Sequence, residues 1–243
     1  MTQNIYDDAG FFAGYSQLPR SVYGLDGAPE WPALRALLPD LRERRVLDLG
    51  CGFGWFCRDA RAQGAAQVRG IDVSERMLER ARRETADVHV SYERADLETV
   101  TLPRESFDLV YSSLAFHYLV GLDRLMAAIH AALVPGGRLV FSVEHPAMTA
   151  PRHPGWGIDA AGQKAWPVNG YLDEGPRTTH WLAPDVIKQH RTLATYVNLL
   201  ACTGFTVAHV DEWAPTAEQV AAHPEWADER LRPPFLLIAA DRR

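Results

Sequence analysis

The chain has 243 residues, of which 47% are hydrophobic and 23% charged, the balance of a soluble globular protein with a full core. Its formal net charge of -6 argues against a partner held mainly through nucleic-acid phosphates. No apolar run reaches the roughly 20 residues that span a bilayer, and residues 1–15 do not resemble a signal peptide. The three cysteines form neither a disulfide framework nor a metal-ligand pattern. We therefore expect a cytoplasmic protein with no metal, no nucleic acid and no membrane partner.

From position 45 onward, short apolar runs alternate with segments of helical period. Strands are expected at 46–50, 68–71, 88–92, 107–111 and 138–143, and helices at 55–63, after Ser74 and over 122–133. Strands that alternate with helices at this spacing imply right-handed crossovers and a mainly parallel sheet that is covered on both faces. The predicted fold class is therefore α/β.

The alternation breaks after position 145. Residues 146–185 contain six prolines and three tryptophans, and a long segment of this kind without periodicity is usually functional. Its aromatic residues favour an ordered cap. A helix is then expected from about His190 to Cys202, followed by strands at 205–210 and 235–240.

A glycine-rich loop follows the first expected strand, in the segment Val46-Leu47-Asp48-Leu49-Gly50-Cys51-Gly52-Phe53-Gly54. Glycines at alternate positions let the backbone turn tightly and approach a ligand closely. Asp72 closes the next expected strand, 22 residues after Gly50, where its carboxylate can accept hydrogen bonds from both hydroxyls of a ribose. The loop and this acid together predict a ligand that contains a nucleoside.

Two kinds of nucleoside ligand compete for this loop. A dinucleotide requires the spacing G-x-G-x-x-G, whereas here the third glycine comes one place early, at Gly54, and Trp55 follows it. Asp48 would repel a pyrophosphate, but it suits an ammonium or sulfonium group. These features disfavour an NAD-dependent oxidoreductase, which stays as an alternative.

The loop resembles that of the class I S-adenosylmethionine-dependent methyltransferases, specifically the small-molecule type with the pattern D-x-G-x-G-x-G (methyltransferase domain 11-like). Three further segments match the same family in order and spacing: Ala95-Asp96-Leu97, residues 106–113, and Leu133-Val134-Pro135-Gly136-Gly137. The resemblance covers roughly residues 44–145. It implies a Rossmann-like, doubly wound, seven-stranded, mostly parallel sheet with an antiparallel last strand and an aromatic-rich cap insertion. It also implies the cofactor S-adenosyl-L-methionine and the product S-adenosyl-L-homocysteine.

By position, the resemblance assigns cofactor-binding roles to residues along this core. Those expected around the methionine part are Arg20, Asp48, Gly50, Cys51, Gly52 and Gly54. Those expected around the nucleoside are Asp72 for the ribose and Val73, Met77, Asp96 and Leu97 for the adenine. Ser112 or Ser113 would line the reaction chamber. We expect one domain over 1–243, with an N-terminal lid at 1–44, a cofactor-binding core at 45–145, a cap at 146–185 and the last helix and strands at 186–243.

Methyl transfer requires an aligned nucleophile and, for some acceptors, a base. His117, His145 and His190 are the candidate catalytic residues, because imidazole transfers protons near neutral pH. Glu144 and His145 are adjacent at a strand end and point to opposite faces, so at most one of them faces the site.

The expected acceptor is a small molecule with an oxygen or nitrogen nucleophile. The Asn/Asp-Pro-Pro-Tyr/Phe segment typical of enzymes that methylate bases or glutamine amides is absent after the fourth strand, where the chain has Ser112-Ser113-Leu114-Ala115. Tyr6, Phe11, Phe12 and Tyr15 are expected to close over the acceptor together with the cap. A non-catalytic protein that binds S-adenosylmethionine or S-adenosylhomocysteine is a further alternative. The assembly is expected to be a monomer or a homodimer.

Overall fold

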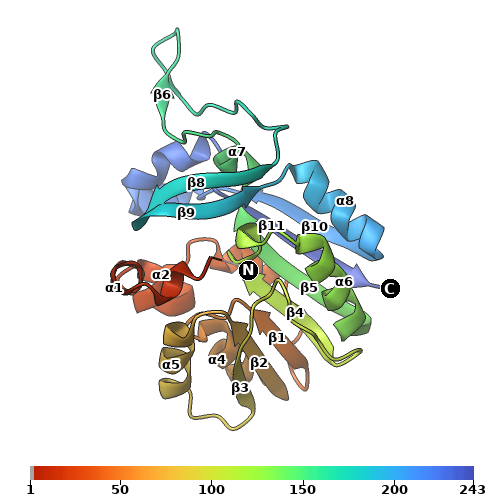
Figure 1. Cartoon of the computed structure of the whole chain (residues 1–243). Helices are drawn as coiled ribbons and strands as arrows, with labels where there is room; N and C mark the ends of the chain where they lie inside the picture. The colour runs from red at the N-terminus through yellow and green to blue at the C-terminus, as the bar shows by residue number, and fades with distance from the viewer. Residues whose placement is uncertain (1–2) are drawn as a thin grey trace.

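The computed structural model describes residues 3–243, which are arranged around one seven-stranded sheet (Figure 1). The strand order is β10-β11-β5-β4-β1-β2-β3. The strands are β1 (Arg45–Leu49), β2 (Gln67–Asp72), β3 (Val90–Arg94), β4 (Phe107–Ser113), β5 (Leu133–Glu144), β10 (Phe205–Trp213) and β11 (Phe235–Arg242). β11 runs antiparallel to both of its neighbours, and the pairs among β1 to β5 are parallel. The predicted α/β fold with an antiparallel last strand is confirmed.

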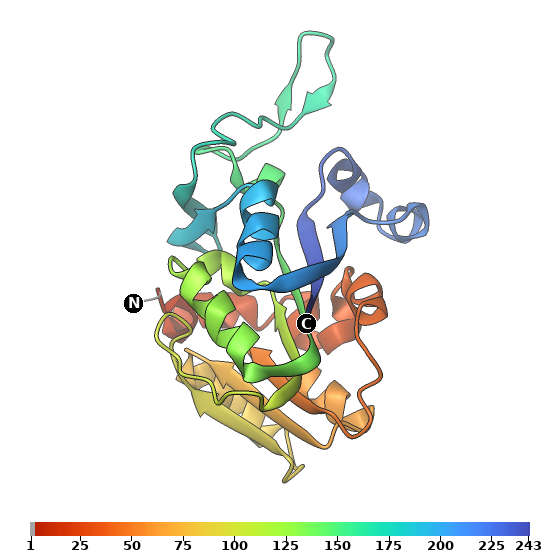
Figure 2. The same cartoon turned by 90° about the vertical axis from the view of Figure 1, so that its right-hand side faces the viewer.

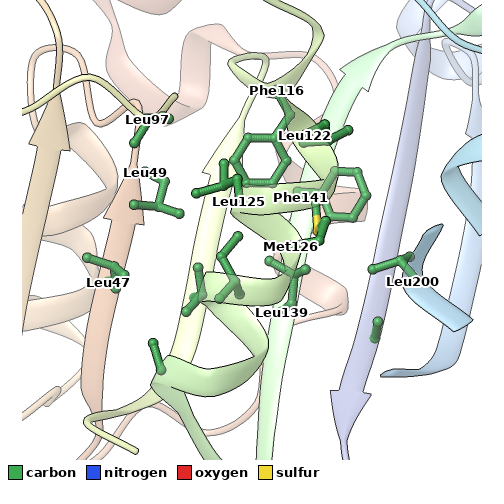
Figure 3. Close-up of a cluster of buried hydrophobic side chains, with 14 of the residues drawn as sticks. Leu47, Leu49, Leu97, Phe116, Leu122, Leu125, Met126, Leu139, Phe141 and Leu200 are labelled. Carbon is green, nitrogen blue, oxygen red and sulfur yellow. The ribbon is translucent and has the colours of Figure 1, made fainter. Parts of the chain in front are cut away.

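Helices cover both faces of this sheet (Figures 1 and 2). They are α3 (Trp31–Ala36), α4 (Trp55–Ala62) and α5 (Glu75–Arg83), and α6 (Leu122–Ala132) and α8 (Leu193–Thr203). α6 and α8 share one buried cluster with the sheet, in which Phe141 of β5 packs with Met126 of α6 and Leu200 of α8 (Figure 3). α3, α4 and α5 contribute to a second cluster. Burial of two apolar layers fixes the sheet between them.

Two of the predicted strands have different bounds in the structure. The strand expected at 88–92 is β3 at Val90–Arg94, because a turn in which the Val90 N–H donates to the Asp87 carbonyl uses the preceding residues. Val88 is accordingly 91% exposed. The strand expected at 138–143 is part of a longer β5 that begins at Leu133.

The N-terminal segment lies across the edge of the sheet at which the parallel strands end (Figure 1). Its elements are η1 (Ile5–Asp7), α1 (Ala9–Tyr15), α2 (Pro19–Val22) and η2 (Gly24–Gly27). Asp7 accepts a 2.6 Å hydrogen bond from Ser74 Oγ, just beyond β2. Gln3 bonds the backbone of Asp185 and Ile187 in the cap. The segment therefore links the end of β2 to the cap.

The cap consists of a short helix and two hairpins above the sheet (Figures 1 and 2). Its elements are α7 (Pro146–Thr149), β6 (Gly157–Ile158), β7 (Lys164–Ala165), β8 (Gly175–Trp181) and β9 (Ala183–His190). The boundary expected at 185 falls within β9. The helix expected from His190 begins instead at Leu193, because β9 continues to His190 and Thr192 caps the helix by accepting from Thr195 N–H.

Short helices complete the chain. They are η3 (Phe116–Tyr118) after β4, and α9 (Ala217–Ala222) and η4 (Pro224–Arg230) between the last two strands. A capping box between Thr216 and Gln219 starts α9. The polar connection between β10 and β11 is therefore helical.

Candidate functional site

A cavity of about 280 Å³ opens where the parallel strands end. One residue at or just after each of the strands β1 to β5 lines it: Gly50, Asp72, Asp96, Ser113 and Glu144. The carboxyl ends of parallel strands meet at the same edge of a sheet, which is where open α/β sheets bind ligands. The topology therefore brings together residues that lie almost 100 positions apart.

The glycine loop after β1 forms one wall of this cavity. Gly50, Gly52 and Gly54 all have positive φ, at 77°, 51° and 72°. A Cβ atom at Gly50 would lie 2.5 Å from the Cβ atom of Ala115, whereas a Cβ atom at Gly52 would meet nothing within 4 Å. Gly50 is thus required by the tight turn, and Gly52 leaves open space for a ligand.

Asp72 lies beside this open space at the end of β2. Its Oδ2 accepts from Gly52 N–H and its Oδ1 from Ser74 N–H, each at 2.9 Å. Burial raises the pKa of this carboxyl group above its ordinary value, and these backbone donors oppose the rise. Each oxygen keeps a further lone pair, so the side chain can accept both hydroxyls of a ribose.

Four other predicted residues lie along the same end of the cavity: Val73, Met77, Asp96 and Leu97 all line it. Met77 and Leu97 are also buried. Asp96 accepts a 3.0 Å hydrogen bond from Glu98 N–H, which orients its carboxylate at the start of the loop. An apolar slot with one acid at its edge suits a purine that carries an amino group.

A second cavity of about 100 Å³ adjoins the first and shares Tyr15, Arg20, Gly50, Gly52 and Ser113 with it. Asp48 and Cys51 line only this second cavity. Burial raises the pKa of Asp48 to about 7, although the Cys57 thiol donates to its Oδ2 at 3.3 Å.

Arg20 lines both cavities. It donates to both oxygens of Glu30, at 3.0 and 3.2 Å, and Glu30 is fully buried. Acids and a guanidinium group around one opening can bind an ammonium and a carboxylate, the two ends of an amino acid.

Two of the predicted cofactor residues line neither cavity. Ser112 is fully buried and donates to the Leu49 carbonyl at 2.7 Å, so it joins β4 to β1 while its neighbour Ser113 faces the cavity. Gly54 is the left-handed N-cap of α4, and a Cβ atom there would overlap the Tyr92 hydroxyl. Both residues therefore shape the fold rather than the surface of the site.

His117, in η3, lines the large cavity and is 2% exposed. Its Nδ1 accepts from the Glu144 backbone N–H at 3.3 Å, which leaves the ring proton on Nε2. Burial lowers the pKa of His117 to about 4. The neutral ring is therefore a hydrogen-bond donor at neutral pH and not the proton acceptor that a catalytic histidine supplies.

This burial has a measurable consequence for stability. Below pH 6.5 the unfolded chain protonates His117 while the folded chain does not, so the contribution of His117 to stability is complete above pH 6.5 and is lost as the pH falls toward 4. When the pH falls from 7 to 4.5, the unfolding free energy of the wild type should decrease by about 2–3 kcal/mol more than that of His117→Asn. Urea unfolding at both pH values tests this, with the exposed His89→Asn as control. Equal losses in His117→Asn and the wild type would contradict the buried neutral ring.

His145 and His190 lie outside the lining of both cavities, contrary to their predicted catalytic role. His145 Nε2 is 2.9 Å from Glu212 Oε1, and its Nδ1 accepts from Ala147 N–H to cap α7. Both ring nitrogens of His190 have partners, Thr149 Oγ1 and the Tyr171 carbonyl, each at 2.8 Å. All four ring nitrogens of the two histidines therefore have partners within the protein.

Glu144, not His145, is the residue of the adjacent pair that faces the cavity. Its Oε1 accepts from Lys188 Nζ in β9 at 2.5 Å, and both side chains are largely buried, at 15% and 5% exposure. Side chains of neighbouring residues in a strand point to opposite faces, so the sequence predicts that only one of the pair faces the cavity. It does not predict which one. Nothing in the sequence points to Lys188, which lies 44 residues away.

Aromatic rings from four parts of the chain form the remaining wall. Tyr6 and Tyr15 come from the N-terminal segment, Tyr118 from η3, Trp181 from β8 and Phe235 from β11. The rings of Tyr15 and Trp181 lie 6.3 Å apart, and the Tyr6 and Tyr118 hydroxyls are 3.3 Å apart. The sequence indicates closure by Tyr6, Tyr15 and the cap, whereas Tyr118 and Phe235 carry no distinguishing signal.

Among residues 3–243, no group of three or more His, Cys, Asp or Glu side chains is arranged to hold a metal ion. No helix in the same range is both long and apolar enough to cross a bilayer.

The chain is similar to known proteins over most of its length. A family model for a methyltransferase domain matches residues 47–141. An S-adenosylmethionine-dependent methyltransferase from Mesorhizobium loti, known from its crystal structure, is 56% identical in sequence. The match covers 90% of this chain and 100% of that chain, with a TM-score of 0.87. A structure from Listeria monocytogenes is 42% identical, with 89% and 99% covered and a TM-score of 0.81. A protein of Haemophilus influenzae is 35% identical over 98% of this chain and 96% of its own.

The match to the Mesorhizobium loti enzyme covers 90% of this chain, so it extends well beyond residues 47–141, which the family model matches. The chain belongs to the S-adenosylmethionine-dependent methyltransferases, with S-adenosylmethionine as its cofactor.

Proposed function

We propose that the protein transfers a methyl group from S-adenosylmethionine to a nitrogen or oxygen atom of a small molecule. One observation carries this proposal: a single cavity joins the acid at the end of β2 to a chamber lined by Glu144, His117 and aromatic rings. A nucleoside bound at Asp72 would extend toward that chamber. The chamber is therefore the place for a methyl acceptor.

The lining residues fit the cofactor. The space in front of Gly52 is open, and Asp72 beside it has lone pairs for a ribose. Val73, Met77 and Leu97 would hold the adenine, and Arg20 would face the methionine carboxylate. When bound, the cofactor supplies a methyl group that its sulfonium already activates.

The protein's own task is then to align the acceptor and to keep water away from it. The N-terminal segment and the cap meet over the chamber, with the ring of Phe11 5.5 Å from that of Trp181. Walls that approach from two sides leave space for a small acceptor and not for a folded protein or a duplex. This closure supports the small-molecule class.

Calorimetric titration of the full chain with S-adenosylmethionine, S-adenosylhomocysteine and NAD tests the cofactor site. We expect micromolar binding of the first two and none of NAD. A screen of small hydroxyl and amine compounds for S-adenosylhomocysteine release then tests transfer. Cofactor binding without transfer to any acceptor would favour a non-catalytic binding protein, and binding of NAD alone would overturn the proposal.

His117→Ala should keep the affinity for S-adenosylhomocysteine within twofold and lower turnover at least tenfold. The reason is that the ring lies in the chamber and offers Nε2–H as a donor, which the small side chain cannot replace. Calorimetry and initial rates with an identified acceptor measure the two quantities, and His89→Ala serves as the exposed control. Wild-type turnover in His117→Ala would show that the ring does not position the acceptor.

A further inference from the structure

We propose that the methyl acceptor is a primary or secondary amine whose nitrogen binds beside the carboxylate of Glu144. This inference rests on the proposed function and narrows it to one class of acceptor. It follows from the hydrogen bonds of Glu144, from the charges that line the chamber, and from the bases that are present there.

Glu144 offers one unpaired oxygen to the chamber. Its Oε1 is held by Lys188 Nζ at 2.5 Å, whereas Oε2 makes no hydrogen bond to any residue from 3 to 243. Oε2 is also not among the fully buried polar atoms that lack a partner, and Glu144 lines the cavity. An acceptor molecule with an N–H group can donate to this oxygen.

The charges around the cavity favour a cation over an anion. Its acidic lining residues are Asp72, Asp96 and Glu144, and Arg20 is the one cationic lining residue among those described. Arg20 is paired with the buried Glu30 and would face the carboxylate of the bound cofactor, and Lys188 is paired with Glu144. An acceptor that carries a carboxylate or phosphate would therefore meet repulsion and no free positive partner.

The aromatic wall of the chamber also favours a cationic acceptor. The rings of Tyr6, Tyr15, Tyr118, Trp181 and Phe235 line the chamber. The faces of such rings attract cations, and the Lys188 ammonium already lies 5.1 Å from the centre of the Trp181 ring. The same surface stabilises a positive charge that forms on the acceptor during transfer.

The chamber holds no strong base. An alcohol or phenol must lose its proton to become an effective nucleophile, but His117 Nδ1 is occupied by the Glu144 N–H. Burial would raise the pKa of Glu144, but its interactions with His117 and with the Lys188 ammonium group hold it below its ordinary value. Burial raises the pKa values of Tyr6 and Tyr15, so these hydroxyls stay protonated.

An amine needs no base in the transfer step. The ammonium form gives one proton to bulk water before it attacks, and the free nitrogen then uses its lone pair to form the N–C bond. The C–S bond breaks with its electron pair on sulfur, which leaves a neutral thioether and the protonated, N-methylated form of the acceptor amine. The positive charge thus moves from sulfur to nitrogen, where the Glu144 carboxylate stabilises it.

Matched probes of one shape test this inference. Benzylamine, benzyl alcohol and benzoate are titrated by calorimetry at pH 8 into the full chain saturated with S-adenosylhomocysteine, and a propyl series repeats the comparison. We expect the amine of each series to bind at least tenfold more tightly than the alcohol and the carboxylate. Incubation of benzylamine with S-adenosylmethionine should give N-methylbenzylamine by mass spectrometry.

Variants then assign the preference to Glu144. Glu144→Gln should reduce the preference for the amine below twofold and keep the S-adenosylhomocysteine affinity within twofold. The double variant Glu144→Gln/Lys188→Met removes both buried charges and should behave likewise, which separates the loss of the carboxylate from an unpaired lysine. Glu218→Gln, an exposed acid in the first turn of α9, should keep the wild-type preference.

Failure of this inference differs from failure of the proposed function. Equal affinities for amine and alcohol, tighter binding of the carboxylate, or no amine binding would overturn the amine proposal while cofactor binding stands. A preference that survives in Glu144→Gln would overturn the role of that carboxylate. A wild-type chain that binds no S-adenosylhomocysteine would remove the proposed function itself.

Discussion

Asp72→Ala is expected to weaken the binding of S-adenosylmethionine and S-adenosylhomocysteine by more than tenfold. Asp72 is oriented by the N–H groups of Gly52 and Ser74, so its remaining lone pairs point at a fixed position. A hydrogen bond to a charged group contributes about 1.5–3 kcal/mol, and about 1.4 kcal/mol corresponds to a tenfold change in affinity. Calorimetric titration of the variant with both ligands measures the loss.

The control for this variant is Asp123→Ala, which removes an exposed acid from the first turn of α6. It should bind both ligands with wild-type affinity. Wild-type affinity in Asp72→Ala would instead show that the ribose is held elsewhere, and the placement of the cofactor in this cavity would be wrong.

Gly52→Val should abolish cofactor binding, with at least a hundredfold loss of affinity, while the protein still folds. The space around a Cβ atom at this position is empty for 4 Å, so the new side chain meets no protein atom and enters the ligand's volume. The remaining cost is the left-handed backbone at φ 51°, about 1–2 kcal/mol for a residue with a side chain. Calorimetry and urea unfolding measure the two effects separately.

Gly136→Val is a matched control for the backbone. Gly136 has φ 79° and nothing within 4 Å of its Cβ position, and it is an exposed residue near the start of β5 that lines neither cavity. We expect a similar loss of stability in both variants and normal binding in Gly136→Val alone. If Gly52→Val still binds S-adenosylhomocysteine, the open space in front of the loop is not the cofactor site.

The cap and the acceptor chamber were the least predictable parts of the molecule. Residues 146–185 show no alternation of apolar and polar residues that would predict β8 and β9, because prolines and exposed polar residues interrupt it. Glu144 and Lys188 meet only after β9 folds back over the end of β5. His145 and His190 lie outside both cavities, which the sequence did not indicate, because partners distant in sequence hold their rings elsewhere.

The α/β fold and the glycine loop with its acid could be predicted from the amino-acid sequence. These features depend on local patterns: strand and helix periods, glycines that must adopt positive φ, and an acid at a strand end. Parallel pairing of β1 with β2, which sets Leu49 opposite Ile71, then brings the loop to Asp72 without further information.

The side chains that face the cavity, in contrast, are set by contacts between distant segments. The tertiary structure turned Ser113 and Glu144 toward the cavity and Ser112 away from it, and it gave His117 a backbone donor that fixes its proton on Nε2. Such choices depend on the direction of each side chain and on contacts between segments far apart in the chain. Local sequence patterns do not determine which side chains face the cavity, because a shift of one position along a strand turns a side chain to the opposite face of the sheet.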